Sequence, residues 1–177
     1  MIKFLIILLI PLVSFANDRT PYYGSLSQTE SWLRHYPNKF DFKDETEKFF
    51  LTQKNMPVKV IQEHMSEGND FKDWYRIQLF NGIEGWIYHT QLNNRKRSLL
   101  ILEDTELYAL NSFDSNSWLT IKKGEILSPK IVDLLKVTPT MFKVSILLDE
   151  RKKIIGWIIR DDRVWGDDPN ELEKDFD

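Results

Sequence analysis

The stretch Asp73-Trp74-Tyr75-Arg76-Ile77-Gln78-Leu79-Phe80-Asn81-Gly82-Ile83-Glu84-Gly85-Trp86-Ile87-Tyr88 decides the fold of this chain. In its first half Tyr75, Ile77 and Leu79 alternate with polar residues, which predicts a strand with one buried face. Asn81-Gly82 is the dipeptide that tight type I′ turns favour, because both residues tolerate a positive φ. The stretch therefore predicts a β-hairpin, and a wider connection is the alternative to the two-residue turn.

The same pattern returns later in the chain. Phe142-Lys143-Val144-Ser145-Ile146 takes the place of the first strand, and Gly156-Trp157-Ile158 takes the place of Gly85-Trp86-Ile87. An upstream strand recurs as well, because Val58-Lys59-Val60-Ile61 precedes the first copy and Ile126-Leu127 precedes the second at nearly the same offset. Three landmarks that recur in one order predict the internal duplication of a small β unit.

Each copy is expected to close on itself as a small barrel, because short strands with open edges tend to pair with other chains. Gly85 and Gly156 would permit a bend or a close backbone approach within a strand. Trp86 and Trp157 follow these glycines, and their indoles would fill the interior of a barrel that has few other large residues. We therefore expect all four residues to be structural core.

The N-terminus reads MIKFLIILLIPLVSFA over residues 1–16, with one positive charge at Lys3, an apolar run and a small-x-small ending before Asn17. That order is typical of a secretory signal peptide. An uncleaved anchor or a buried strand is the alternative, but the apolar run is shorter than the ~20 residues of a spanning helix. We expect the signal peptide to be removed and the mature chain to be a soluble protein of the periplasm or cell envelope.

The composition is that of an ordinary globular protein, with 42% apolar and 29% charged residues, a net charge of −3 and no cysteine. It excludes a disulfide scaffold, a disordered acidic protein and a collagen-like fibre. Acidic residues gather in residues 161–177, where eight acids stand against Arg163 and Lys174. We expect a solvated, frayed terminus, with an interaction arm as the alternative. The rest of the chain is barely basic and predicts no nucleic-acid interface.

The hairpin resembles the D-W-x-R-I … G-x-x-G-W-V/I … L signature of bacterial SH3-like domains, and most closely that of exported proteins with two such domains in tandem. The second copy is similar to the terminal repeat of that family, because Val164-Trp165-Gly166 follows Gly156-Trp157-Ile158-Ile159 in the manner of its closing L-W-G. The resemblance implies an all-β fold of two small SH3-like barrels in tandem after the signal peptide. The expected segments are a signal peptide at 1–16, an N-terminal extension at 17–27, a first barrel at 28–97, a second, divergent barrel at 98–166 and an acidic tail at 167–177.

The chain departs from the family pattern at its opening turn and in its second copy. The N-L-R-x-G-P-G turn survives only as Leu33-Arg34 and Pro37, with both glycines gone, and the W-C pair of the second copy appears as Met141-Phe142. The resemblance implies a fold and an envelope location. It implies a ligand only loosely, since such domains are similar to modules that bind cell-wall peptides or other proteins.

No catalytic constellation is visible in the sequence. Cysteine is absent, and the histidines His35, His64 and His89 have no metal-ligand spacing to one another. His35 and His89 could meet in space, but surface histidines are the simpler interpretation. We therefore expect a non-enzyme without a metal site or cofactor.

A binding surface is the remaining interpretation. Aromatic residues are dense between the first strand and Pro57, and acidic residues stand among them. Flat rings beside carboxylates could hold an extended peptide that carries basic groups. The alternative places Phe49 and Phe50 in a strand, with other aromatics packing the loop onto the barrel. The candidate ligand-binding residues are Trp32, Tyr36, Asp41, Asp44, Glu47, Trp74 and Tyr88.

Two function classes follow. The first is a binding module for a cell-wall peptide or an envelope protein, with its groove on the first barrel and a second barrel that lacks a comparable aromatic loop and is mainly supportive. The second is a structural or assembly protein of the cell envelope, whose barrels bury the aromatics against each other and leave no groove. Exposure of Trp32, Tyr36 and Trp74 discriminates between the two.

Overall fold

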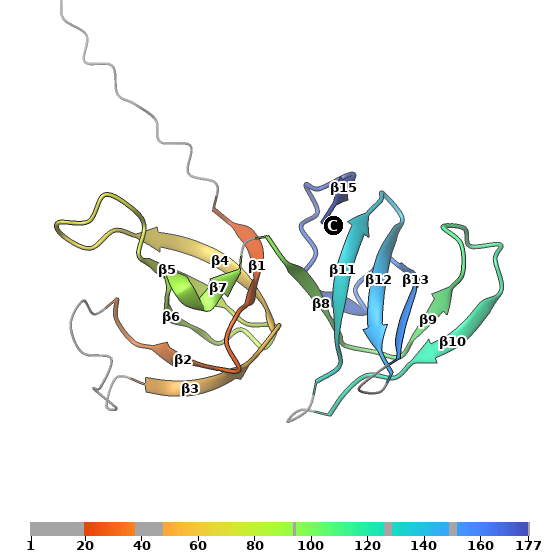
Figure 1. Cartoon of the computed structure of the whole chain (residues 1–177), viewed down its shortest axis with the longest axis horizontal. Coiled ribbons are helices and arrows are strands. Elements are labelled where there is room, and N and C mark those ends of the chain that lie inside the picture. Colours follow the sequence, from red (N-terminus) through yellow and green to blue (C-terminus); the bar gives the residue numbers. More distant parts are fainter. Residues whose placement is uncertain (1–19, 38–47, 94, 126–128, 149–151, 177) are drawn as a thin grey trace, which may run out of the picture.

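The computed structural model describes residues 20–37, 48–93, 95–125, 129–148 and 152–176. Within these ranges the chain is built from β-strands and a single turn of 3-10 helix, η2 (His89–Gln91). The strands form two curled sheets that lie side by side (Figure 1). The all-β fold is therefore confirmed. The proposed signal peptide, residues 1–16, lies outside the described residues, and no helix among the described ones is long and apolar enough to span a membrane.

The first sheet has the strand order β3-β2-β6-β5-β4-β1-β7 within the described residues, and the second has β10-β9-β13-β12-β11-β8-β14, with β15 paired to β11. The strands of the first sheet are β1 (Tyr22–Leu26), β2 (Glu30–Arg34), β3 (Lys48–Gln53), β4 (Pro57–His64), β5 (Trp74–Gln78), β6 (Glu84–Tyr88) and β7 (Leu92–Asn93). Those of the second are β8 (Arg97–Ile101), β9 (Thr105–Tyr108), β10 (Ser117–Ile121), β11 (Ile131–Val137), β12 (Met141–Leu147), β13 (Lys153–Ile159), β14 (Val164–Trp165) and β15 (Lys174–Asp175).

The two sheets repeat one topology, because adding seven to each strand number of the first order gives the second order. The registers agree as well. Gly85 pairs with Ile77 in the first sheet, and Gly156 pairs with Val144 in the second. These are the positions that the sequence pattern aligned, so the duplication is visible in the backbone. We call the two sheets with their loops the first unit and the second unit.

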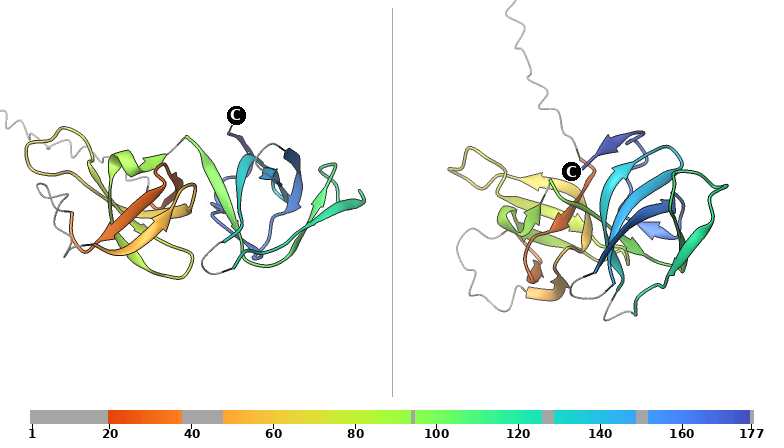
Figure 2. Two further views of the ribbon diagram at one scale, coloured as in Figure 1. Left: turned by 60° about the horizontal axis from the view of Figure 1, so that its bottom comes forward. Right: turned by 45° about the vertical axis from the view of Figure 1, so that its right-hand side comes forward.

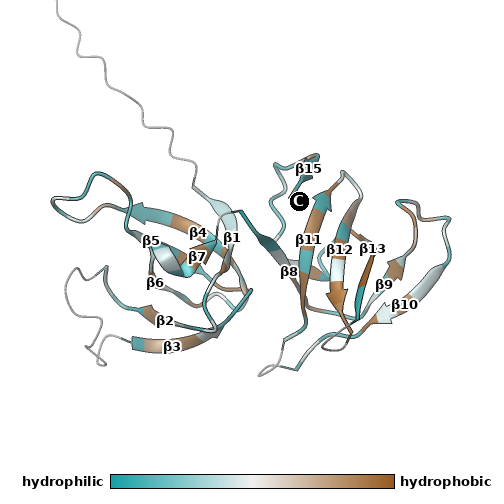
Figure 3. Ribbon diagram, in the orientation of Figure 1, coloured by the Kyte–Doolittle hydropathy of each residue, from teal (hydrophilic) through white to brown (hydrophobic). Residues whose placement is uncertain are grey.

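Each unit has its own apolar core. In the first unit Ile77 and Leu79 are buried and Tyr75 packs partly buried against them, which confirms the predicted buried face of β5. In the second unit Phe142 and Val144 hold the equivalent positions and are fully buried. Hydrophobic residues accordingly mark the central strands β11, β12 and β13 in Figure 3.

The turn between β5 and β6 differs from the expected type I′ turn. The Gly82 N–H donates to the Leu79 carbonyl at 3.0 Å, and the Leu79 N–H donates to the Ile83 carbonyl at 2.9 Å. Gly82 has a φ of 82°, whereas Asn81 is not in the positive-φ region. The connection is therefore the wider alternative, a three-residue loop whose last residue is left-handed.

The predicted upstream strand of the second unit, Ile126-Leu127, lies outside the described residues. The strand equivalent to β4 is β11, since Val60 pairs with Ile77 and Leu134 pairs with Val144. The spacing misled because the loops differ in length. A long connection separates β4 from β5, whereas β11 turns into β12 through only three residues.

Strand β1 lies inside the segment 17–27 that was expected to be an extension. It pairs with β4 along four residues and also with β7, so the first sheet begins at Tyr22. The segment was hard to recognise because Tyr22–Leu26 is short and carries a glycine and a serine. Its serine, Ser25, is nonetheless fully buried.

The acidic tail is not a frayed terminus over its described residues. Two of its acids form ion pairs with arginines. Asp167 accepts a hydrogen bond from Arg160 Nε at 2.8 Å, and Glu171 accepts one from Arg97 Nη1 at 3.1 Å. Strand β15 then pairs with β11, and Phe176 packs against the second core. Charge counting missed this docking because Arg97 lies 74 residues before Glu171 and Arg160 lies just outside the acidic segment.

Strand β8 connects the units and runs between them (Figure 2). The hydroxyls of Ser25 and Ser98 lie 2.6 Å apart, and the Ser98 hydroxyl also donates to the Asn55 carbonyl at 2.5 Å. On the other side of the junction Tyr23 packs edge-on against Trp165, with 5.4 Å between ring centroids. The units therefore meet through buried polar and aromatic contacts.

Candidate functional site

Neighbouring strands of the first unit turn an aromatic side outward. Side chains alternate along a strand, and residues paired across a ladder point to the same side. Trp86 on β6 pairs with Arg34 on β2, while Trp74 on β5 pairs with both Tyr88 and His64. The core residues of these strands alternate with them. We call the outward aromatic residues the first aromatic face: Trp32, His64, Trp74, Trp86 and Tyr88.

The rings of this face contact one another. Trp74 and Tyr88 meet edge-on with 5.4 Å between centroids, and His64 and Trp86 meet edge-on at 5.9 Å. The Lys48 ammonium lies 5.9 Å from the centroid of the Trp32 ring. Edge-on aromatic pairs and cation contacts of this kind fix ring orientation.

Trp86 and Trp157 are not the buried anchors that the sequence predicted. Both indoles are only partly buried, because the inward positions of their strands belong to the residues on either side of them. In β6 those inward residues are Gly85 and Ile87. The expectation failed because it placed a glycine and the next residue on the same side of one strand.

Gly85 and Gly156 are core residues, as predicted. A Cβ on Gly85 would lie 2.9 Å from the Leu33 Cβ and from the Phe49 Cζ. A Cβ on Gly156 would lie 2.7 Å from the Leu107 Cγ and 2.9 Å from the Tyr108 carbonyl oxygen. The neighbouring strand therefore lies so close to each glycine that there is no room for a Cβ atom at that position.

Trp74 does not form an exposed groove wall. It is 2% exposed, because Tyr88 covers it from β6 and His64 pairs with it from β4. Tyr88, the other candidate residue here, is partly exposed and remains accessible to a ligand. The outer surface at this end of the face is made by Tyr88.

Trp32 and Tyr36 lie where a ligand could reach them. Trp32 is partly exposed on β2, and Tyr36, just beyond the end of that strand, is 66% exposed. Asp41, Asp44 and Glu47 lie outside the described residues, as do Phe40 and Phe42.

Phe49 belongs to a strand, which was the alternative to a place in the aromatic loop. It belongs to β3, as does Phe50, but Phe50 packs against the core whereas Phe49 is 38% exposed. The His35 ring stacks on Phe49 with 4.4 Å between centroids. The ladder between β2 and β3 shifts its register here, so Phe49 is an extra residue of a β-bulge, and its ring lies against Gly85 at the margin of the core.

Asp73 positions the loop that leads into β5. Its carboxylate accepts from the Ser66 N–H at 2.7 Å and from Asn69 Nδ2 at 2.8 Å. Burial by itself raises the pKa of Asp73, but these hydrogen bonds outweigh it, so that the pKa lies below its ordinary value. Asp73 is therefore a structural carboxylate beneath the aromatic face.

The histidines pack against aromatic rings. His89 lies against Tyr88 at 4.5 Å and Phe71 at 5.2 Å between centroids, and it does not meet His35, which stacks on Phe49. Among the described residues no group of histidine, aspartate and glutamate side chains could hold a metal ion.

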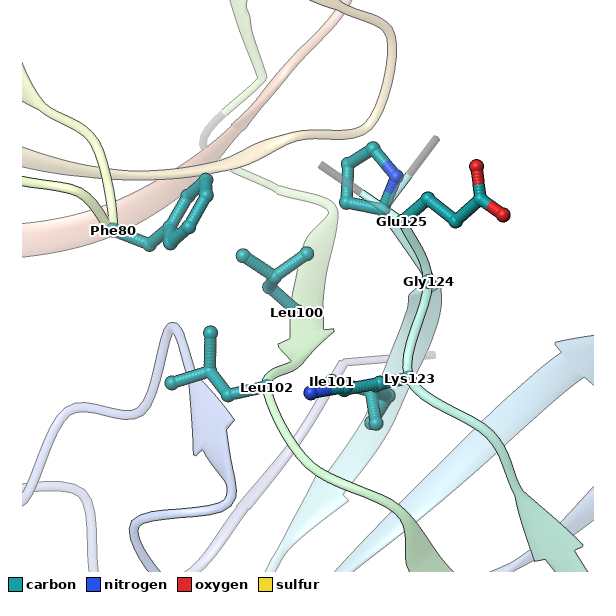
Figure 4. Close-up of a pocket in the computed structure, with 8 residues that line it drawn as sticks. Phe80, Leu100, Ile101, Leu102, Lys123, Gly124 and Glu125 are labelled. Carbon is teal, nitrogen blue, oxygen red and sulfur yellow. The ribbon is translucent and has the colours of Figure 1, made fainter. Parts of the chain in front are cut away.

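A separate cavity of about 750 Å³ lies at the junction of the two units. Phe80, from the β5–β6 turn, faces Leu100 and Leu102 across it (Figure 4). Lys123 and Glu125 stand at its rim, just before a segment that lies outside the described residues. No sequence pattern pointed to this cavity, because its walls come from both units.

No protein-family model matches the chain, and no curated protein matches it. Among solved structures the chain is similar to NlpC1 from Trichomonas vaginalis, with 12% sequence identity and a TM-score of 0.34 over 85% of this chain and 47% of that one. It is similar to NlpC2 from Trichomonas vaginalis, with 12% identity and a TM-score of 0.31 over 82% of this chain and 48% of that one. The chain thus spans about half the length of these proteins.

Proposed function

We propose that the chain is an exported, non-catalytic envelope protein with two SH3-like barrels in tandem, and that its first aromatic face binds an extended peptide of the cell wall or of an envelope protein. The signal-peptide pattern and the family resemblance of the sequence support the location. One observation carries the binding proposal: Trp32, Trp86 and Tyr88 stand partly exposed on one side of a single sheet.

The chemistry of the face suits a peptide. Flat rings give a ligand contact area at little cost in conformational entropy. The Lys48 ammonium already makes a cation–π contact with the Trp32 ring, so an amine of a ligand could bind in the same place. The carboxylates of Asp41, Asp44 and Glu47 belong to the connection between β2 and β3 and would favour an amine-bearing ligand.

The alternative is a structural or assembly protein without a ligand groove. It requires the two units to bury the candidate aromatics against each other. The junction instead uses Tyr23 and Trp165, and Tyr36 remains exposed. Trp74 is buried, but by Tyr88 and His64 of its own unit, so the balance favours the binding module.

The test is a calorimetric titration of the mature chain with a synthetic cell-wall stem peptide, accompanied by a pull-down from envelope extract. We expect modest binding, around micromolar, because a shallow face offers few buried anchors. A Trp32→Ala, Tyr36→Ala, Trp86→Ala triple variant that is still folded should bind at least about 10-fold more weakly, a loss of ~1.4 kcal/mol.

Leu172→Ala is the matched control, because Leu172 is 68% exposed and lies on the tail of the second unit. It should bind as the wild type does. If the wild type binds neither the stem peptide nor an envelope protein, or if the triple variant binds as tightly as the wild type, the structural alternative replaces this proposal.

A further inference from the structure

Strand β10 is an edge of the second sheet. Among the described residues it pairs with β9 alone, and β9 in turn pairs with β13 only where Tyr108 meets Trp157. The β9–β10 hairpin lies at the side of the second unit away from the first unit (Figure 1). An edge strand directs every second N–H and C=O away from its neighbour, where they are available to another strand.

The hairpin also exposes large apolar side chains. Trp118 on β10 is 54% exposed, and Leu110 and Phe113, in the connection from β9, are 64% and 56% exposed. A two-stranded hairpin has little stability of its own. A strand added to the free edge of β10 would bind its backbone groups and cover part of this apolar surface.

The edge lacks the residues that usually protect an edge strand. Residues 115–121 contain no charged residue and no proline, and their sequence is Ser115-Asn116-Ser117-Trp118-Leu119-Thr120-Ile121. Lysine or proline on an edge normally prevents its pairing with another chain. Here the charges stand only at the two ends of the stretch, where Asp114 precedes it and Lys122 follows it, and both side chains are exposed.

These end charges match those of a second copy of the same strand. When two copies of β10 pair antiparallel with Trp118 opposite Trp118, positions 114 and 122 come next to each other, because they are equally far from position 118. Asp114 of each copy then lies beside Lys122 of the other, and the twofold axis gives this pair twice. Lys122 also binds Asp104 of its own chain, with 2.7 Å between Nζ and Oδ2.

The equivalent edge of the first unit carries like charges instead. Strand β3 is the edge of the first sheet within the described residues, and it begins at Lys48, while the exposed Lys54 follows its last residue. Pairing of two copies of β3 about Leu51 would place Lys48 of one copy beside Lys54 of the other. Like charges in that arrangement are destabilising, so self-pairing is disfavoured at β3 and favoured at β10.

We propose that β10 is a dimerisation edge, at which two copies of the chain pair antiparallel through residues 115–121 with Trp118 at the twofold axis. The partner is a second copy because the uncharged stretch and the opposite charges at its ends are complementary to themselves. The pairing joins the two β9–β10 hairpins into one continuous sheet. It uses no residue of the first aromatic face, so it does not depend on the proposed function.

Sedimentation velocity of the mature chain over a range of concentrations tests the dimer. We expect a reversible dimer with a Kd on the order of 10 μM, because one paired strand buries less surface than a standard interface. Trp118→Lys brings two cations together at the axis and should weaken the dimer at least about 10-fold. Leu51→Lys, the matched change on the exposed edge strand β3, should leave the dimer unchanged. Amide hydrogen exchange in residues 117–121 should slow as the concentration of the wild type rises.

Asp114→Lys tests the register without changing β10 itself. It places a cation beside Lys122 of the other copy and should weaken the dimer roughly 10-fold at low salt, and by less at high salt, because salt screens exposed charges. Urea unfolding of each variant shows that it is still folded. A wild type that stays monomeric at about 1 mM overturns the proposal. A dimer that both Trp118→Lys and Asp114→Lys leave intact, or that Leu51→Lys abolishes, overturns it as well.

Discussion

The glycine before the tryptophan of each hairpin is required by packing and not by a turn. Gly85→Ala and Gly156→Ala should each destabilise the protein by about 1–3 kcal/mol, the usual cost of overpacking. Gly156→Ala should be the worse of the two, because its Cβ would also lie 2.9 Å from a carbonyl oxygen that the ladder holds in place. Urea unfolding monitored by tryptophan fluorescence measures both costs.

Gly82→Asn is the control for these two variants. Gly82 has a positive φ, which asparagine tolerates, and nothing lies within 4 Å of its missing Cβ. The control should change stability by no more than about 0.5 kcal/mol. Equal losses in all three variants would show that backbone freedom, and not close packing, is what the glycines provide.

Truncating the tryptophan of β5 should cost more stability than truncating the tryptophan of β6. Trp74 is almost fully buried, so Trp74→Ala should cost ~3–5 kcal/mol. Trp86→Ala should cost less than that, because its indole is only partly buried. Denaturant midpoints of the two variants give the order directly, and a larger loss for Trp86→Ala would contradict the outward orientation of its side chain.

The Asp73 carboxylate should make stability depend on pH in the acid range. Its pKa lies below the ordinary value of 3.8, so its contribution is present above that value and is lost as the pH falls through the folded-state pKa. Asp73→Asn should therefore be less stable than the wild type at pH 7, and the difference should shrink below about pH 4. Urea midpoints recorded between pH 7 and pH 3 test this, and a difference that stays constant with pH would exclude the ionised carboxylate as its cause.

At the scale of elements, alternation and recurrence predicted the central hairpins well. Tyr75, Ile77 and Leu79 revealed β5 because a half-buried strand must alternate, and the repeated Gly-Trp pair revealed β13. Strand β1 was harder to predict, because Ser25 is buried by pairing with β4, which lies far along the chain. The turn was missed because Asn81-Gly82 suits a two-residue turn, whereas the loop has three residues and only Gly82 has a positive φ.

The site was predicted less well than the fold, for a reason that also lies in the strands. A one-residue difference in phase exchanges the two faces of a strand. The sequence placed Trp86 inside, whereas it lies partly exposed on the outward side of β6. Trp74 lies on the outward side, as expected, but contact with Tyr88 buries it. The bulge that exposes Phe49 has no signature in the sequence.

The C-terminal tail should stabilise the second unit although it ends the chain. Deleting residues 167–177 removes β15 and the partner of the buried Arg97 guanidinium. An uncompensated buried charge costs about 3–5 kcal/mol, so the deletion should lower the urea midpoint clearly. Leu172→Ala, on the same segment but exposed, should leave it unchanged. A deletion variant as stable as the wild type would mean that the tail is a free arm after all.

At the scale of the whole molecule, the units repeat one topology but are not independent. Arg97 stands at their junction, between the rings of Tyr23 and Phe176 at 5.5 and 5.3 Å from the centroids. Its Nη2 donates to the Gly166 carbonyl at 2.7 Å. The Arg97 side chain therefore contacts the first strand and the C-terminal tail from the connecting strand, so the same residues that close the second unit also join it to the first.

The most direct measurement of peptide binding is an NMR titration of the mature chain, labelled with ¹⁵N, with the stem peptide. The six tryptophans give six indole N–H signals: Trp32, Trp74, Trp86, Trp118, Trp157 and Trp165. The account predicts that the signals of Trp32 and Trp86 shift, while those of the buried Trp74 and the junction residue Trp165 stay in place. Unchanged signals from Trp32 and Trp86 at saturating peptide would contradict it.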